Sequence, residues 1–184
     1  MALTTFVSGQ VLTAAQLNDS FAAVGGLRLI KTQTVGTAVS SVAVTGAFSS
    51  TYDNYLITLN GGTGSASAAI RLQLGASTTG YYGSLTFANA TVGTASAAGT
   101  NNDTAVPFVG GMIAGNMAHV LCHVLGPNLA AYTKVVNAAY QNGDNYGTSQ
   151  HEHRVATAYT DFTLIPSTGT LTGGTIRVYG YQNS

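Results

Sequence analysis

The tripeptide His151-Glu152-His153 is the densest group of chemically active side chains in this 184-residue sequence. On a β-strand alternate residues share a face, so the two histidines would point the same way and could both ligate a metal ion. A zinc site needs three or four protein ligands, and the zinc-protease spacing H-E-x-x-H is absent because position 155 is valine. We expect a polar loop, or a ring of these histidines around a three-fold axis that binds anions or a metal between chains. A metal site within one chain is the weaker interpretation, and no cofactor is expected.

Asp103 and Asp144 come closest to a catalytic pair of carboxylates, because both fall in segments that we expect to be loops. A glycosidase needs two carboxyl groups that face each other across a sugar. The acidic residues are isolated from one another along the sequence. We therefore predict no catalytic residue and no enzyme activity. A glycan-degrading enzyme that uses Asp103 and Asp144 is the remote alternative.

Ten tyrosines and no tryptophan give the chain many side chains that combine an apolar ring with a polar tip. Most of them are expected to be ordinary strand residues, since tyrosine is common in sheets. Tyr146 differs because it lies beside Asn145 in the polar stretch QNGDNYGTSQ, residues 141–150. We predict an exposed contact surface made of Tyr146, Asn145, His151 and His153, which would meet a host glycan or receptor.

The elements that must position these residues are short strands. From residue 27 onward, apolar residues recur at every second position in runs that end at glycine, serine, threonine or asparagine. This spacing predicts an all-β fold, an antiparallel β-sandwich of jelly-roll type. Residues 106–112 and 119–125 are expected to pair across a turn at 115–116. Residues 88–105 and 141–153 are expected to be the longest loops, and therefore the natural sites of exposed contacts.

Residues 13–24 are different, because their apolar residues follow a helical period. Thr13 and Gln16 form a T-x-x-Q capping box, and glycines at 25 and 26 end the predicted helix. Its apolar stripe consists of Leu12, Leu17, Phe21 and Val24. An isolated helix of about eleven residues is marginal in water and must pack on something. We predict that residues 1–26 are an attachment and oligomerisation segment, and that residues 27–184 are the β-sandwich domain.

The composition limits the classes of partner. Charged residues make up 7% of the chain, with six basic and six acidic side chains, whereas roughly 25% is typical. Such a surface is poorly protected against self-association, so we expect much of it to be buried against sister chains. The basic residues are scattered singly, which argues against nucleic acid as a partner. The sequence shows no signal peptide and no apolar run that spans a bilayer, so we expect synthesis in the host cytoplasm and no membrane insertion.

Three stretches resemble structural proteins of bacteriophage virions. FVSGQVLTAAQLNDSF, residues 6–21, resembles the start of many tail-fibre and minor virion proteins. GAFSSTYDNYLITLNG, residues 46–61, resembles a strand-turn-strand of the same group, and GTIRVYGYQNS, residues 174–184, resembles their C-terminal strand. The resemblance implies a trimeric, non-enzymatic β-sandwich with an N-terminal attachment segment. The long shaft of a tail fibre is absent, which keeps a capsid decoration or head-spike protein as an alternative.

Together these observations predict a homotrimeric projection on the virion surface, a short tail fibre or tail tip that contacts the host. The expected partners are sister chains, other virion proteins bound through residues 1–26, and a glycan or receptor on the host surface.

Overall fold

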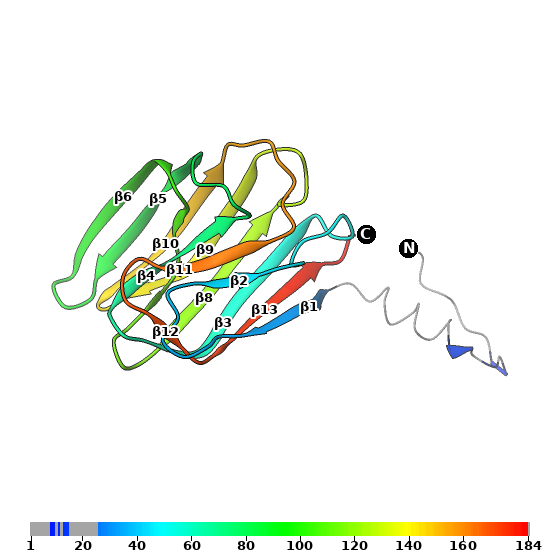
Figure 1. Ribbon diagram of the computed structural model, residues 1–184, viewed down its shortest axis with the longest axis horizontal. Helices are drawn as coiled ribbons and strands as arrows, with labels where there is room; N and C mark the ends of the chain where they lie inside the picture. Colours follow the sequence, from blue (N-terminus) through cyan, green and yellow to red (C-terminus); the bar gives the residue numbers. More distant parts are fainter. Residues whose placement is uncertain (1–7, 10, 12, 15–25, 184) are drawn as a thin grey trace.

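The computed structural model describes residues 8, 9, 11, 13, 14 and 26–183, and the last of these ranges forms an antiparallel β-sandwich (Figure 1). The predicted all-β sandwich is therefore confirmed. The residues proposed to form the attachment stripe, Leu12, Leu17, Phe21 and Val24, lie outside the described residues. None of the helical structure among the described residues is long and apolar enough to cross a membrane.

The larger layer contains eight strands, which pair with antiparallel neighbours throughout. In their order across the sheet they are β1 (Leu27–Thr34), β13 (Thr175–Tyr181), β3 (Asn54–Gly64), β8 (Ala118–Leu125), β9 (Thr133–Asn142), β10 (Asn145–His153), β5 (Tyr81–Asn89) and β6 (Thr94–Asp103). Figure 1 shows β5 and β6 at one end of the molecule and β1 near the other.

The smaller layer packs against the first part of this sheet. It contains β2 (Val42–Val44), β11 (Phe162–Pro166), β4 (Ala68–Leu74) and β7 (Val106–Met112), in that order. β7 also pairs with the beginning of β8, as the sequence predicted, and β12 (Leu171–Thr172) pairs with the end of β3. Because consecutive strands such as β2 and β3, or β3 and β4, belong to different layers, the chain passes repeatedly from one layer to the other in a jelly-roll-like manner.

The core lies between the two layers and follows directly from the alternation in the sequence. In β3 the side chains of Tyr55, Ile57 and Leu59 are fully buried, and the residues between them face outward. In β4 the buried side chains include Ile70 and Leu72. Complete burial of each such aliphatic side chain stabilises the fold by about 1.5–3 kcal/mol relative to an exposed position.

Two segments that the sequence analysis predicted as long loops are hairpins instead. Residues 141–153 contain the two-residue turn Gly143-Asp144, after which β10 returns antiparallel to β9, with a β-bulge between Gly147 and Ser149. Residues 88–105 contain β6, which pairs with β5 over most of its length. Polar residues and small residues have low strand propensity, but the cross-strand hydrogen bonds with an already formed neighbour override it.

Candidate functional site

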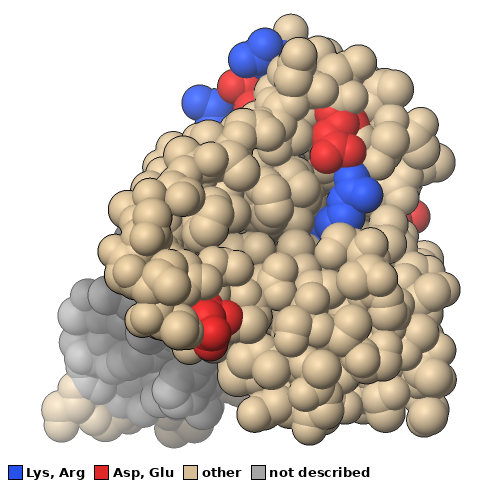
Figure 2. All heavy atoms as spheres, turned by 90° about the vertical axis from the view of Figure 1, so that its left-hand side faces the viewer, with Lys and Arg blue, Asp and Glu red and all other residues tan. Residues whose placement is uncertain are grey.

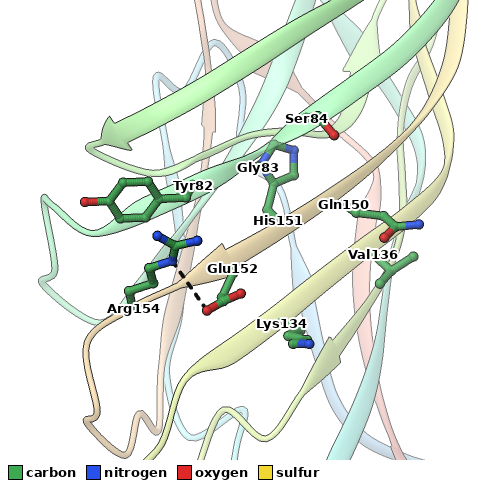
Figure 3. A pocket seen from close by; sticks show the side chains of 9 residues that line it. All are labelled: Tyr82, Gly83, Ser84, Lys134, Val136, Gln150, His151, Glu152 and Arg154. Atoms are coloured by element: carbon green, nitrogen blue, oxygen red, sulfur yellow. Dashed lines mark ion pairs between the residues drawn. The ribbon is translucent and has the colours of Figure 1, made fainter.

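A shallow depression of about 280 Å³ lies on the outer face of the larger sheet, where β5, β10 and β9 run side by side (Figure 3). Its side chains come from three strands and from the residue that follows β10. They are Tyr82, Gly83 and Ser84 from β5, Lys134 and Val136 from β9, and Gln150, His151, Glu152 and Arg154 from β10 and its end. We call this depression the sheet pocket.

The register of the hairpin brings the polar groups of the sheet pocket together. Glu152 is directly opposite Lys134 on one side and Tyr82 on the other. Directly opposite residues in a sheet have Cβ atoms about 4.5–5.5 Å apart, so residues eighteen positions apart in the sequence become neighbours. Figure 3 shows these side chains projecting from the same region of the three strands.

Arg154 is held by two contacts at the edge of the sheet pocket. Its Cζ lies 4.4 Å from the centre of the Tyr82 ring, and its Nε lies 3.5 Å from Oε1 of Glu152. Both charged side chains are partly exposed, so the ion pair contributes little to stability, while the ring fixes the orientation of the guanidinium group. Among the described residues Lys134 forms no ion pair. The sheet pocket therefore carries two cations and one anion.

The surface around the sheet pocket is nearly uncharged. Figure 2 shows the end of the molecule that carries β5 and β6, where charged side chains occur in a few small groups on an otherwise uncharged surface. Three of the twelve Lys, Arg, Asp and Glu residues of the chain line the sheet pocket. A quarter of the charged side chains of the chain are therefore gathered at one place on the larger sheet.

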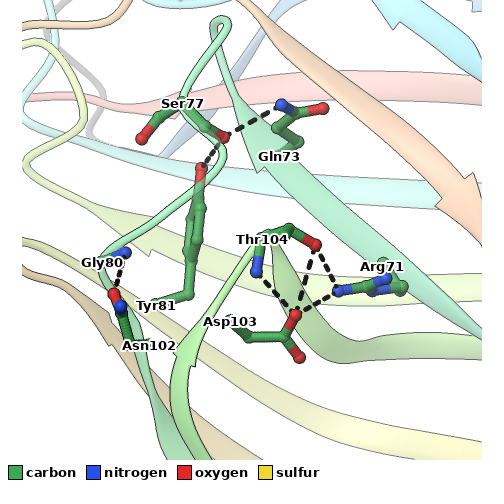
Figure 4. A network of polar contacts seen from close by, with 8 residues as sticks. All are labelled: Arg71, Gln73, Ser77, Gly80, Tyr81, Asn102, Asp103 and Thr104. Atoms are coloured by element: carbon green, nitrogen blue, oxygen red, sulfur yellow. Dashed lines mark hydrogen bonds and ion pairs between the residues drawn. The ribbon is translucent and has the colours of Figure 1, made fainter.

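A polar network fixes the end of β5 that carries Tyr82 (Figure 4). The hydroxyl group of Tyr81 accepts a hydrogen bond from the Leu74 amide at 2.8 Å and donates one to the Ser77 carbonyl at 3.3 Å. Burial raises the pKa of Tyr81 to about 12, so its hydroxyl remains protonated. Nearby, Arg71 donates a hydrogen bond of 2.6 Å to Asp103. These contacts tie β5 and β6 to β4 and make the wall of the sheet pocket rigid.

His151 and His153 face the interior, so the prediction that they are exposed contacts is wrong. Their exposed fractions are 4% and 0%, because β10 alternates and places Gln150 and Glu152 outside. Because both side chains are buried within one chain, they cannot form the predicted ring of histidines around a three-fold axis between chains. The ring of His151 lies against Gly83, where an added Cβ atom would collide with it and with the Gln150 carbonyl. Its backbone and the glycine thus form the floor of the sheet pocket.

Burial governs the protonation of both histidines. It lowers the pKa of His151 to about 4, and the charge of Asp103 and the Tyr82 backbone offset part of this shift. Neither ring nitrogen of His151 has a hydrogen-bond partner of good geometry. Burial also lowers the pKa of His153, partly offset by the Thr79 carbonyl. Both side chains are therefore neutral at pH 7.

The contact of 2.9 Å between Ser77 Oγ and His153 Nε2 has the distance of a nucleophile and its base, but not the chemistry. The same Nε2 lies 3.1 Å from the Thr79 carbonyl oxygen, which only accepts hydrogen bonds, so Nε2 carries the proton and cannot take one from serine. His153 Nδ1 has no partner that would orient the ring. This pair is a structural contact.

Asp103 and Asp144 are not brought together. Asp103 is opposite Tyr81 at one end of β5, whereas Asp144 lies beyond Asn89 at the other end, so they are roughly 26 Å apart. Glycosidase carboxyl pairs are about 5–10 Å apart. Among the described residues, no group of three histidine, cysteine or carboxylate side chains is placed to hold a metal ion.

Tyr146 is 49% exposed, as its predicted role requires, and Asn145 accepts a hydrogen bond from Asn89. Both lie towards the hairpin turn, roughly 13 Å along β10 from Gln150 and outside the sheet pocket. Sequence reasoning missed Tyr82, Lys134 and Arg154. The turn sequence Asn-Gly-Asp-Asn at 142–145 favours a tight hairpin, but its register alone would place Lys134 opposite His153. The β-bulge between Gly147 and Ser149, which the sequence does not signal, shifts the partner of Lys134 to Glu152.

No protein-family model matches this chain, and a search of curated proteins finds no match. Among solved structures, a fructosyltransferase from A. japonicus is similar with a TM-score of 0.33 and 12% sequence identity. The similarity covers 94% of this chain and 29% of that one, so the chain spans less than a third of the enzyme's length. A TM-score this low carries no argument about fold or activity.

Proposed function

We propose that this chain is a non-enzymatic surface protein of a bacteriophage virion, a short tail fibre or tail tip whose sheet pocket binds a saccharide of the host surface. The observation that carries the proposal is the sheet pocket itself. It gathers a tyrosine, an amide, a carboxylate and two cations on a rigid sheet face whose surroundings are nearly uncharged.

The side chains of the sheet pocket match the chemistry of a saccharide. Gln150 and Glu152 offer acceptors for sugar hydroxyl groups, and Arg154 and Lys134 offer donors. Hydrogen bonds that involve a charged partner contribute about 1.5–3 kcal/mol each, more than neutral ones. Tyr82 adds an aromatic wall with a polar tip. An open, shallow pocket suits a ligand that is part of a larger surface polymer, since the rest of the polymer can extend out of the pocket without a clash.

Two further observations support a binding module of a virion rather than an enzyme. The carboxylates considered for catalysis, Asp103 and Asp144, are at opposite ends of β5. The stretches that resemble phage structural proteins, residues 46–61 and 174–184, include most of β3 and all of β13, which are neighbours in the larger sheet. A virion location is part of the same proposal.

The experiment is an array of bacterial surface polysaccharides probed with the labelled full-length protein. We expect binding to a subset of the glycans without release of sugar. Arg154→Gln should weaken binding by about tenfold or more, the loss of one charge-assisted contact. Tyr82→Ala should weaken it by about tenfold, because it removes the aromatic wall and the ring that orients Arg154. Tyr132→Ala is the matched control, because Tyr132 is 55% exposed and lies outside the sheet pocket. Equal binding by all four proteins, or binding by none, would refute the proposal.

Capsid decoration is the second candidate, and exposed apolar side chains on the larger sheet favour it. Leu27, Leu29 and Leu121 are 46%, 52% and 38% exposed, as expected of a protein that packs closely into a shell. Counting copies in purified particles separates the two candidates. A tail protein should be present in few copies, whereas a decoration protein should be present in tens to hundreds.

A further inference from the structure

The outer face of β1, β13, β3 and β8 carries a cluster of leucine and tyrosine side chains among threonine, asparagine and histidine residues. Leu29, Tyr179 and Leu56 are directly opposite one another in adjacent strands. Leu27 is opposite Tyr181, and Leu121 is opposite Thr58. We define the apolar face as the side chains of Leu27, Leu29, Leu56, Leu121, Tyr179 and Tyr181.

The same strands also bury apolar residues on their other side, towards the core. Ile57, Cys122 and Val178 alternate with members of the apolar face and are fully buried. A strand that is apolar on both sides is typical of a sheet that is covered on both sides. Among the described residues, no strand pairs across or covers this outer face.

We propose that the apolar face is the interface with a second copy of this chain. Besides threonine, asparagine and histidine, the outward positions of these four strands hold tyrosine, leucine and one arginine, Arg177, but no lysine, aspartate or glutamate. Enrichment in tyrosine and arginine and depletion of these other charged residues distinguishes protein interfaces from ordinary surface. A chain with zero net charge and 7% charged residues also meets little repulsion from its own copies.

The size of the face is consistent with part of a stable interface. Four strands spaced by about 4.8 Å and three rows of outward residues cover roughly 400 Å², about half of what each partner contributes to an interface of standard size. The six residues of the apolar face hold about half of these twelve positions, and polar side chains such as His123 and Thr58 hold the others. The segment predicted to mediate assembly, residues 1–26, ends where β1 begins. The first residue of β1, Leu27, is itself a member of the apolar face. The inference concerns the assembled state of the proposed function and does not depend on saccharide binding.

The test is sedimentation velocity of the full-length protein over a range of concentrations. The wild type should associate, and Leu29→Asp and Leu121→Asp should each weaken association by about tenfold or more, because a charge would be buried in the interface. Val92→Asp is the control, since Val92 is 68% exposed in the turn between β5 and β6. A wild type that is monomeric at every concentration, or face variants that associate like the wild type, would overturn the inference.

A second measurement does not depend on the fold tolerating a new charge. In Leu29→Cys, the introduced thiol should react with a soluble thiol reagent more slowly as protein concentration rises, whereas the thiol of Val92→Cys should react at a constant rate. The native Cys122 is fully buried and does not compete. A reaction rate at position 29 that is independent of concentration in an associated protein would place the interface elsewhere. Saccharide binding by the same samples reports separately on the sheet pocket.

Discussion

Acid should destabilise this protein through His151, which lies under the floor of the sheet pocket. Burial lowers the pKa of this histidine to about 4 in the folded state, whereas an unfolded histidine titrates near pH 6.5. The unfolded chain therefore binds more protons between these values. Stability is full above pH 6.5 and is lost progressively as the pH falls towards 4. A difference of 2.5 pKa units limits the loss to about 3 kcal/mol, of which about 2 kcal/mol should appear between pH 7 and pH 4.5.

The assay is urea unfolding followed by tyrosine fluorescence or circular dichroism at several pH values from 7 to 4.5. His151→Leu keeps a side chain of similar volume without a titrating group, so its stability should fall by about 2 kcal/mol less than that of the wild type over this range. Leu85→Ala is the control: it loses stability by a packing defect near the sheet pocket, but retains the wild-type dependence on pH. Parallel loss of stability in the wild type and His151→Leu would refute the reasoning.

The other predictions concern the framework of the sheet pocket and the core, and each is read from urea unfolding at pH 7. Tyr81→Phe leaves the buried Leu74 amide without its acceptor and should cost about 1–3 kcal/mol; an unchanged midpoint would contradict this. Gly83→Ala should destabilise by about 1–3 kcal/mol, because the new Cβ meets the His151 ring and a backbone carbonyl; a neutral effect would show that the strand shifts freely. Leu72→Ala should cost about 2–5 kcal/mol as a fully buried leucine, and a smaller loss would indicate a core that collapses around the cavity.

The alternation of apolar residues was sufficient to predict the sandwich, because a strand with one buried side places an apolar residue at every second position, whereas a helix does not. Strand β3 shows this most clearly, with Tyr55, Ile57 and Leu59 inside. The pattern failed for β6 and β10, whose small or polar residues have weak strand propensity. Their strands form because β5 and β9 supply unpaired backbone groups beside them, a cause that lies in tertiary structure.

The candidate site was less predictable than the fold for the same reason. The spacing of His151 and His153 predicted an exposed pair, but the facing of β10 turns both inward and turns Gln150 and Glu152 outward. Since a shift of one residue in register exchanges the two faces of a strand, the site could not be assigned before the hairpin turn was located. Arg154 became part of it only through contact with Tyr82 from another hairpin.

The central claim is that the sheet pocket binds a saccharide, and NMR titration of the full-length, isotope-labelled protein tests it most directly. The ligand would be a glycan retained on the polysaccharide array. The account predicts concentration-dependent shifts of the backbone and side-chain signals of Tyr82, Gln150 and Arg154, with the signals of Tyr132 unchanged. Saturable shifts confined to residues outside the sheet pocket would contradict the account.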